Sequence, residues 1–362
     1  MKKNVLIVAY DGMNKSGVPG VIMEIINGLN DAYNFSLVVF ENIENHFYYN
    51  RLKELNIEII MFSFNEPSHK IGKFYKELSG FHKATYNFFN TLFKNKHFDC
   101  VHSFKEADSS GIFKAAKRNG IKLRIWHTNV IHKRENNLLG LIINHKLNLT
   151  RRLSSVYVGV SLTSCKNAFK KKDFKVIHNC YNSDIYFYKP AGPFSNLDIV
   201  QIGYFSNNKN QLFTLEVCKI LSQKFPTFKI HFIGYPNDKG YLKQVEDFVK
   251  KEFLQKNVLF HSYDSNQIDI FSKCSYSLMP SIREGFSLTL LEAQACGLKC
   301  VASTSIPGDA NAGGVTYLEL KPELWANYII DDFKKTRGKH VYFDMEKYSR
   351  QHFLKNIKEL YN

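Results

Sequence analysis

The sequence lacks any apolar run long enough to cross a membrane as a helix, which takes about 20 residues. Its apolar stretches, such as residues 5–9, are much shorter. The run at residues 5–9 is also too short for the core of a signal peptide and is soon followed by Asp11, so we interpret it as a first strand. These absences predict a cytosolic protein.

Cysteine pairs and common metal or redox motifs are also missing. The seven cysteines are odd in number and scattered, which argues against a disulfide framework. Cys296 and Cys300 have no second pair of ligands nearby. No Asp-x-Asp, His-Glu-x-x-His, Walker A or Cys-x-x-Cys pattern occurs, and these are spacings typical of metal, phosphate or redox sites. We therefore expect no metal, no cofactor and no nucleophilic triad.

Acidic residues are scarce relative to basic ones, and the imbalance is uneven along the chain. Lys and Arg number 49 against 33 Asp and Glu, a net charge of +16. Residues 1–190 hold 28 of the basic and 15 of the acidic residues, a net charge of +13. Such a basic half could face nucleic acid, an anionic membrane surface or a phosphorylated substrate. A basic nucleic-acid-binding protein is thus one candidate, although no recognised nucleic-acid motif is present.

Residues 69–98 interleave lysines with aromatic residues. Two interpretations of this pattern stay open. Basic and aromatic residues on one helix can form a membrane-surface face. Alternatively, the aromatics belong to the core and the lysines cover a solvated face.

The length of 362 residues favours two domains. Short apolar strands alternate with helical patterns, which is typical of parallel sheets covered by helices. The glycine-rich turn at residues 11–20 contains no G-x-G-x-x-G, so no dinucleotide site is indicated. The fold class is therefore α/β, with doubly wound domains. The predicted strands are residues 5–9, 36–40, 57–62, 100–102, 123–126 and 156–160, then 197–203, 228–234, 258–260, 277–280 and 300–303.

Residues 277–307 carry the most informative pattern: a strand, a loop, a helix predicted over residues 286–296, and a second strand. Glu284 precedes the helix and Glu292 lies about two turns along it. Backbone N–H groups at a helix start form a ready anion site, here those of Gly285, Phe286, Ser287 and Leu288. Flanking carboxylates suit a ligand with central phosphates and hydroxyls at both ends, such as a nucleotide sugar. Otherwise, Glu284 is a helix-start acid and Glu292 a solvated one.

The stretch EGFSLTLLEAQACGLKCVAS, followed by Ile306-Pro307, resembles the E-x7-E motif of retaining GT-B glycosyltransferases of family 4, the bacterial exopolysaccharide, capsule and O-antigen group. The resemblance implies two Rossmann-like doubly wound domains facing each other across a cleft. Residues 1–184 would bind the acceptor and residues 185–345 the nucleotide sugar. Residues 346–362 would form a helix that crosses back to the first domain.

The resemblance also implies roles for single residues. Lys209, after a strand, would hold the donor diphosphate, and Gly17 would approach it. Tyr204 stands where the family has an arginine, so this chain departs from the family in that part of the diphosphate clamp. Glu284 would hold sugar hydroxyls and Glu292 the ribose. The catalytic set is therefore His127, Glu284 and Lys209, and donor binding adds Gly17, Tyr204, Gly285, Phe286, Ser287, Leu288 and Glu292.

Two further observations concern the first domain. His127 ends a predicted strand, at the edge where open α/β sheets bind ligands, and it matches a family histidine that faces the donor sugar and phosphate. His102 matches another family histidine. Lys133 and Arg134 follow closely and could meet an anionic acceptor.

We therefore expect metal-independent transfer of a sugar, with retention, from a nucleotide sugar to a growing surface polysaccharide or lipid-linked saccharide. A UDP-sugar is favoured by family frequency, and peripheral contact with the anionic inner membrane face is possible. The enzyme alternatives are a nucleotide-sugar epimerase and a sugar phosphorylase of the GT-B fold. The alternative of another class remains the nucleic-acid-binding protein.

Overall fold

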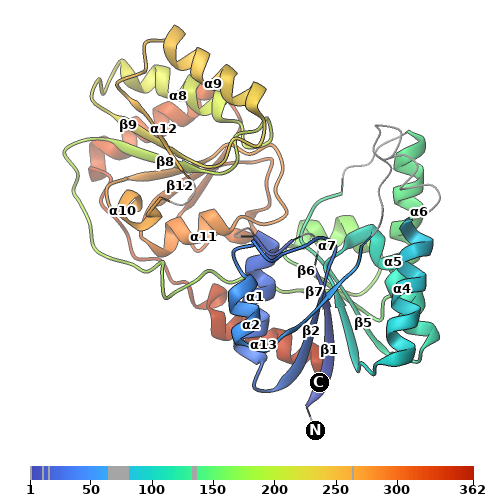
Figure 1. The fold of residues 1–362 in the computed structure, drawn as a ribbon. Helices are drawn as coiled ribbons and strands as arrows, with labels where there is room; N and C mark the ends of the chain where they lie inside the picture. The colour runs from blue at the N-terminus through green and yellow to red at the C-terminus, as the bar shows by residue number, and fades with distance from the viewer. Residues whose placement is uncertain (1, 10–11, 15–16, 64–80, 133–136, 263–264) are drawn as a thin grey trace. The chain divides into compact units, whose positions relative to one another are not determined.

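The computed structural model describes residues 2–9, 12–14, 17–63, 81–132, 137–262 and 265–362. The chain forms two compact units (Figure 1). The first comprises residues 1–179 together with 351–362, and the second comprises residues 180–350. The change of unit at residue 179 lies a few residues before the boundary placed at 184 from the sequence.

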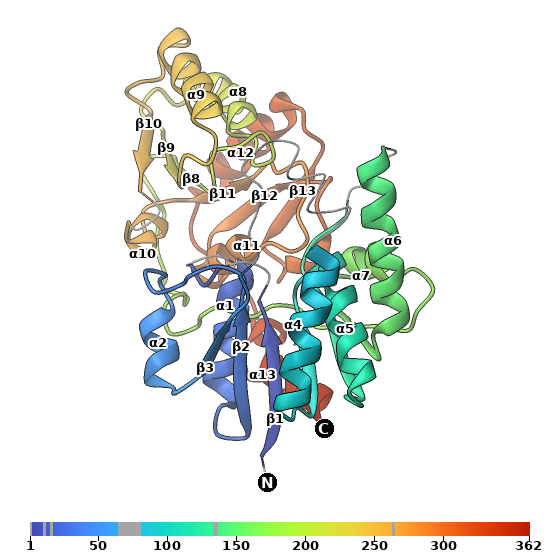
Figure 2. The ribbon, with the colours of Figure 1, turned by 45° about the vertical axis from the view of Figure 1, so that its right-hand side comes forward.

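The first unit is built on seven parallel strands in the order β3-β2-β1-β4-β5-β6-β7. Figure 2 shows β3, β2 and β1 in this order at one side of the sheet. Residues 5–8 of β1 are fully buried, as expected for a strand covered on both faces. The strands are β1 Lys3–Val8, β2 Tyr33–Val39, β3 Glu58–Met61, β4 Cys100–Ser103, β5 Leu123–Thr128, β6 Val156–Gly159 and β7 Lys175–Val176.

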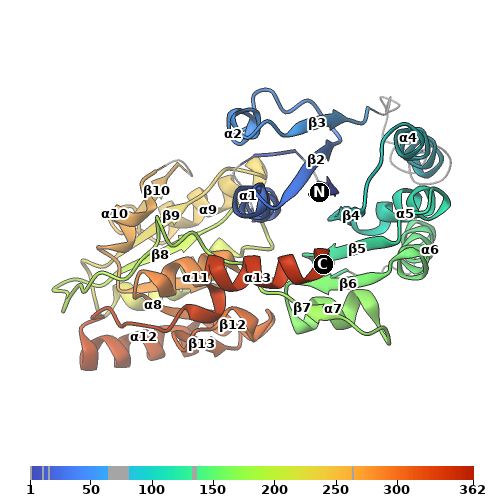
Figure 3. The same ribbon diagram turned by 90° about the horizontal axis from the view of Figure 1, so that it is seen from below.

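Helices cover both faces of this sheet. Helices α4, α5 and α6 lie on one face, and α1 and α13 lie on the other (Figure 3). Helix α13 packs on α1 so closely that a Cβ added at Gly28 would fall 2.2 Å from Leu354 Cδ1. The helices are α1 Gly17–Leu29, α2 Tyr49–Glu54, α4 Phe81–Asn95, the 3-10 turn η2 Glu106–Asp108, α5 Ser109–Arg118, α6 Leu138–Leu153, α7 Leu162–Phe169 and α13 Arg350–Tyr361.

The aromatic residues of α4 belong to the core. Phe81, Phe89 and Phe93 are buried and pack with Phe62 and Phe113. Within this helix the structure therefore bears out the interpretation of core aromatics, while residues 69–80 of the same pattern lie outside the described residues. No helix in the described part of the chain is long and apolar enough to span a membrane.

The second unit contains six parallel strands in the order β10-β9-β8-β11-β12-β13. The strands are β8 Asp198–Ile202, β9 Lys229–Ile233, β10 Val258–His261, β11 Tyr276–Met279, β12 Lys299–Ser303 and β13 Val315–Leu318. The helices are α8 Gln211–Ser222, α9 Lys239–Lys251, α10 Gln267–Phe271, α11 Leu288–Ala295 and α12 Pro322–Thr336, with 3-10 turns η3 Gly308–Ala310 and η4 Glu346–Tyr348.

Both units have the strand order of a doubly wound Rossmann sheet. The strands that follow the first are added on one side of it and then on the other, and we call the point where this order changes side the reversal. The reversal lies between β1 and β4 in the first unit and between β8 and β11 in the second. The predicted α/β fold of two doubly wound parallel sheets is confirmed. In such sheets ligands bind outside the carboxyl ends of the strands at the reversal.

Three helix starts differ from their predicted positions. Helix α1 already begins at Gly17, so the glycine turn is shorter than residues 11–20. Helix α11 begins at Leu288 because the Ser287 hydroxyl accepts from the backbone N–H of Leu290 and caps the helix. Helix α13 begins at Arg350 rather than 346, because Ser349 is extended and separates η4 from the helix.

Candidate active site

Lys209 and Glu284 meet at the reversal of the second sheet. Lys209 follows β8 and Glu284 follows β11, the two strands that flank the reversal. Lys209 Nζ lies 2.7 Å from Glu284 Oε1, and the side chains are 19% and 15% exposed. The structure thus brings two sequence-predicted site residues into one ion pair at the edge where such sheets bind ligands.

The backbone around Lys209 positions its side chain. Gly203 directly follows β8 with φ +154°, and a Cβ there would lie 3.0 Å from Lys209 Cδ. The lysine stem therefore crosses a site where only glycine leaves room. The backbone of Lys209 is also held by side chains of β8 and α8. Gln201 Nε2 donates to the Lys209 carbonyl at 2.7 Å, and Thr214 Oγ1 donates to Gln201 Oε1 at 2.7 Å.

Two asparagines join the loop after β8 to the loop after β11. Asn208 Nδ2 donates to the Arg283 carbonyl at 2.9 Å, and the Ile282 N–H donates to the Asn208 carbonyl at 2.9 Å. Asn210, with φ +58°, donates through Nδ2 to the Pro280 carbonyl at 3.3 Å. Neither asparagine was identified from the sequence. The asparagine-rich stretch at residues 207–210 could have indicated a tight turn there, because asparagine tolerates the left-handed region.

Apart from Tyr204, the remaining donor-site residues of this unit lie just before or within α11. Gly285 and Phe286 lead into the helix, Ser287 caps it, and Leu288 is its first residue. The first N–H groups of a helix have no intrahelical carbonyl partner. Glu292 lies one turn further along and is half-buried. Tyr204, the second residue after β8, is 42% exposed.

In the first unit, His127 is the end of a buried hydrogen-bonded chain. Its Nδ1 lies 3.1 Å from His102 Nε2, and His102 Nδ1 lies 2.7 Å from the Tyr361 hydroxyl. All three side chains are fully buried, and Phe104 stacks on both histidines. Burial lowers the pKa of His127 to about 3 and holds the pKa of His102 well below its usual value. Both rings are therefore neutral at pH 7.

Glu106 organises the loop after β5 and was not found from the sequence. Its carboxylate accepts from Trp126 Nε1 at 3.2 Å and from the Asn129 N–H at 3.2 Å, and it lies 3.0 Å from His132 Nε2. It is only 6% exposed, with φ +53°. Its position after β4, one of the two strands that flank the reversal, could have identified it as a candidate site residue.

The other predicted site residues of the first unit are Gly17, Lys133 and Arg134. Gly17 is the first residue of α1, and a Cβ there would meet no atom of the described residues within 4 Å. Lys133 and Arg134, predicted for the acceptor, lie outside the described residues, as does Ser16. No cluster of three or more metal-ligating side chains occurs in the part of the chain that the structure describes.

We expect the protein to lose stability on acidification because His127 is buried neutral. Unfolding frees this ring to bind a proton below its ordinary pKa of about 6.5, while the folded ring resists protonation down to about 3. Its contribution is therefore complete above pH 6.5 and falls as the pH drops, by about 1 kcal/mol between pH 7 and 5.5. Urea unfolding at both pH values measures it. His127→Asn should show a smaller loss than the wild type, and an equal loss in both proteins would contradict the prediction.

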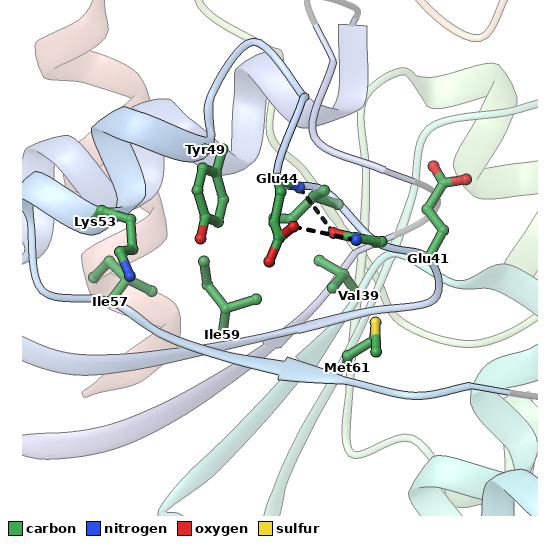
Figure 4. A pocket seen from close by; sticks show the side chains of 10 residues that line it. Val39, Glu41, Glu44, Tyr49, Lys53, Ile57, Ile59 and Met61 are labelled. Atoms are coloured by element: carbon green, nitrogen blue, oxygen red, sulfur yellow. Dashed lines mark hydrogen bonds between the residues drawn. The ribbon is translucent and has the colours of Figure 1, made fainter.

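A pocket of about 370 Å³ lies between α2 and the edge strand β3 (Figure 4). Its apolar wall includes Ile59 and Met61, and Tyr49 and Lys53 approach from α2. Glu44 accepts from Asn42 at its rim. The pocket is two strands away from the reversal of the first sheet, and none of the sequence-predicted site residues lines it.

Sequence comparisons connect this geometry to known proteins. Residues 190–312 match the family described as glycosyl transferases group 1. The chain is 29% identical over 295 residues to the capsular polysaccharide biosynthesis glycosyltransferase CapH of Staphylococcus aureus, covering 75% of this chain and 79% of CapH. It is 25% identical over 261 residues to the putative glycosyltransferase EpsF of Bacillus subtilis, covering 66% and 67%.

Solved structures share the whole fold. Anabaena HepE, crystallised with UDP and glucose, superposes with a TM-score of 0.75 over 98% of each chain at 16% identity. At this identity the likeness establishes the GT-B fold, and it covers both units.

Proposed function

We propose that the protein is an enzyme that moves a sugar from a nucleotide sugar to a saccharide or lipid-linked saccharide of a surface polysaccharide. The match of residues 190–312 to the glycosyl transferases group 1 family and the likeness to GT-B structures support this proposal. The Lys209–Glu284 pair carries the proposal, because it sets a cation beside a carboxylate at the ligand-binding edge of the sheet. A UDP-sugar is the proposed donor, by analogy with the UDP-bound HepE structure. The capsular role of CapH supports a polysaccharide acceptor.

The proposed chemistry needs positive charge where the diphosphate departs. The bond from the anomeric carbon to the phosphate oxygen breaks, a bond to the acceptor oxygen forms on the same face, and the acceptor proton passes to the diphosphate. Lys209 and the amides that begin α11 would stabilise the growing negative charge, without a metal. Gly17 would allow the diphosphate to approach the backbone closely. The exposed Arg283 stands beside Glu284 and could replace the arginine missing at Tyr204.

Carboxylates and a histidine would hold the two ends of the donor. Glu284 would accept from sugar hydroxyls and Glu292 from ribose hydroxyls. His127 would contact the sugar or the leaving phosphate. Lys133 and Arg134 remain proposed for an anionic acceptor, and the basic first half would favour a cytoplasmic enzyme working at the anionic inner membrane face.

Thermal unfolding with a panel of UDP-, GDP- and ADP-sugars tests the proposal first. A ligand at a hundred times its Kd stabilises the native state by about 2.7 kcal/mol, which should raise Tm by roughly 5 to 10 °C for a unit of this size. We expect the shift with UDP-sugars. No shift with any nucleotide sugar would contradict the proposal, and a steeply salt-dependent affinity for DNA or RNA would then support the nucleic-acid alternative.

A second measurement separates transfer from the other activities of the fold. Release of UDP from the donor should require a saccharide acceptor. An epimerase would convert the donor sugar without releasing UDP, and a phosphorylase would act on a saccharide and inorganic phosphate without a nucleotide. Either result would replace the proposed transfer reaction.

A further inference from the structure

The buried chain Tyr361–His102–His127 ends in an atom without a partner. His127 Nε2 is buried and has no hydrogen-bond partner among the described residues. Its other nitrogen is occupied by His102, whose second nitrogen is occupied by the Tyr361 hydroxyl. Leaving a buried polar atom unpaired costs about 1–3 kcal/mol. Such an atom at the carboxyl end of a parallel strand is suited to a ligand.

The Tyr361 hydroxyl, at the far end of this hydrogen-bonded series, determines which atom donates in each of its hydrogen bonds. Within the described residues, His102 Nδ1 is the one hydrogen-bond partner of the Tyr361 hydroxyl. If that hydroxyl accepted from His102, its own hydrogen would stay buried without an acceptor, so it donates instead. His102 then carries its proton on Nε2 and donates to His127 Nδ1. His127 must therefore carry its proton on Nε2.

The protonation states agree with this direction. A doubly protonated ring at either position would place two N–H groups against each other or leave the hydroxyl hydrogen without an acceptor. Burial prevents this, since it keeps the pKa of both histidines low and both rings neutral. The ring planes of His102 and His127 are only 6° apart, and Phe104 covers both. Neither ring can turn without breaking this packing.

We propose that Tyr361, acting through His102, fixes His127 as an Nε2–H hydrogen-bond donor, directed at an oxygen atom of the substrate. Tyr361 is thus a positioning residue supplied by the last turn of α13, 259 positions away from His102. The nature of the ligand oxygen, a phosphate or sugar oxygen of the donor, rests on the proposed function. The protonation pattern of the three residues does not.

Nitrogen-15 NMR of histidine-labelled protein tests the pattern directly. Two-bond proton–nitrogen couplings distinguish the Nε2–H and Nδ1–H forms of a neutral ring, and His127→Asn assigns the signal. We expect wild-type His127 in the Nε2–H form at pH 7. An Nδ1–H form would overturn the proposal, whether or not the protein transfers sugar.

Two hydroxyl deletions form a matched pair. Tyr361→Phe removes the first donor of the chain, whereas Tyr33→Phe removes a hydroxyl from the adjoining ring, 5.1 Å away between centroids, that bonds Asn362 instead. We expect Tyr361→Phe to give mixed His127 tautomers and to lower kcat roughly three- to tenfold. Tyr33→Phe should change neither quantity.

Each outcome decides a separate question. A single Nε2–H form retained in Tyr361→Phe would overturn the role of the tyrosine. If Tyr361→Phe did not fold, the tautomer of the wild-type protein would still decide the direction of the chain. If no nucleotide sugar bound while the tautomers behaved as expected, the proposed function would fail and the role of Tyr361 would stand.

Discussion

Replacing Lys209 by Ala is expected to lower the rate of sugar transfer at least tenfold, which corresponds to about 1.4 kcal/mol of transition-state stabilisation. The lysine places its charge 2.7 Å from Glu284 at the reversal of the second sheet. Without it, the departing diphosphate would lose a fixed cation, and Glu284 would add uncompensated negative charge at the same place.

The chain offers a matched control for this substitution. Lys299 Nζ pairs with Asp332 at 2.7 Å, and these side chains are 18% and 19% exposed. The two ion pairs are thus alike in length and burial, but Lys299 is the first residue of β12, at the end of the sheet opposite the proposed site. We expect Lys299→Ala to destabilise the protein to a similar degree and to leave transfer near the wild-type rate.

Steady-state kinetics and urea unfolding of both variants separate the two effects. A loss of transfer confined to Lys209→Ala would assign the lysine to the reaction. Equal losses in both variants would reduce Lys209 to a structural role, and near-normal turnover of Lys209→Ala would remove it from the site.

Glu292→Ala is also expected to lower transfer at least tenfold, or about 1.4 kcal/mol, because the carboxylate is proposed to hold the ribose hydroxyls. Ribose belongs to both the donor and the released UDP, so UDP should bind more weakly by a similar factor. Isothermal titration with UDP measures this without any transfer. Unchanged UDP affinity would contradict the ribose assignment.

Glu284→Gln provides the contrast within the same loop and helix. Glu284 is proposed to contact only the transferred sugar, so its loss should weaken binding of the UDP-sugar and spare that of UDP. Glu252→Ala serves as the neutral control, since this half-buried carboxylate pairs with Lys219 at the end of α9, away from the proposed site. If Glu284→Gln and Glu292→Ala weakened UDP equally, the proposed division of roles would be wrong.

Local patterns made the fold predictable. The unbroken apolar run of β1 indicates a strand buried on both faces. The alternation of such strands with helical patterns along the chain indicates a parallel sheet. The stretch from β11 to β12 was equally predictable, because its strand, loop, helix and strand are neighbours in the chain. Helix starts were less accurate, since a cap such as Ser287 and an extended residue such as Ser349 act through single side chains or dihedral angles.

Side-chain contacts between distant segments could not be predicted in this way. Lys209 and Glu284 are 75 positions apart, and they meet because β8 and β11 are neighbours in the sheet. The two residues had been predicted separately, but their ion pair, the asparagine links beside it and the Glu106 network depend on strand order. Tyr361 was predicted as part of a helical tail, and only the docking of α13 places its hydroxyl on His102. Periodicity reports which face of an element is buried, whereas the partners it meets there are selected by the packing of the whole unit.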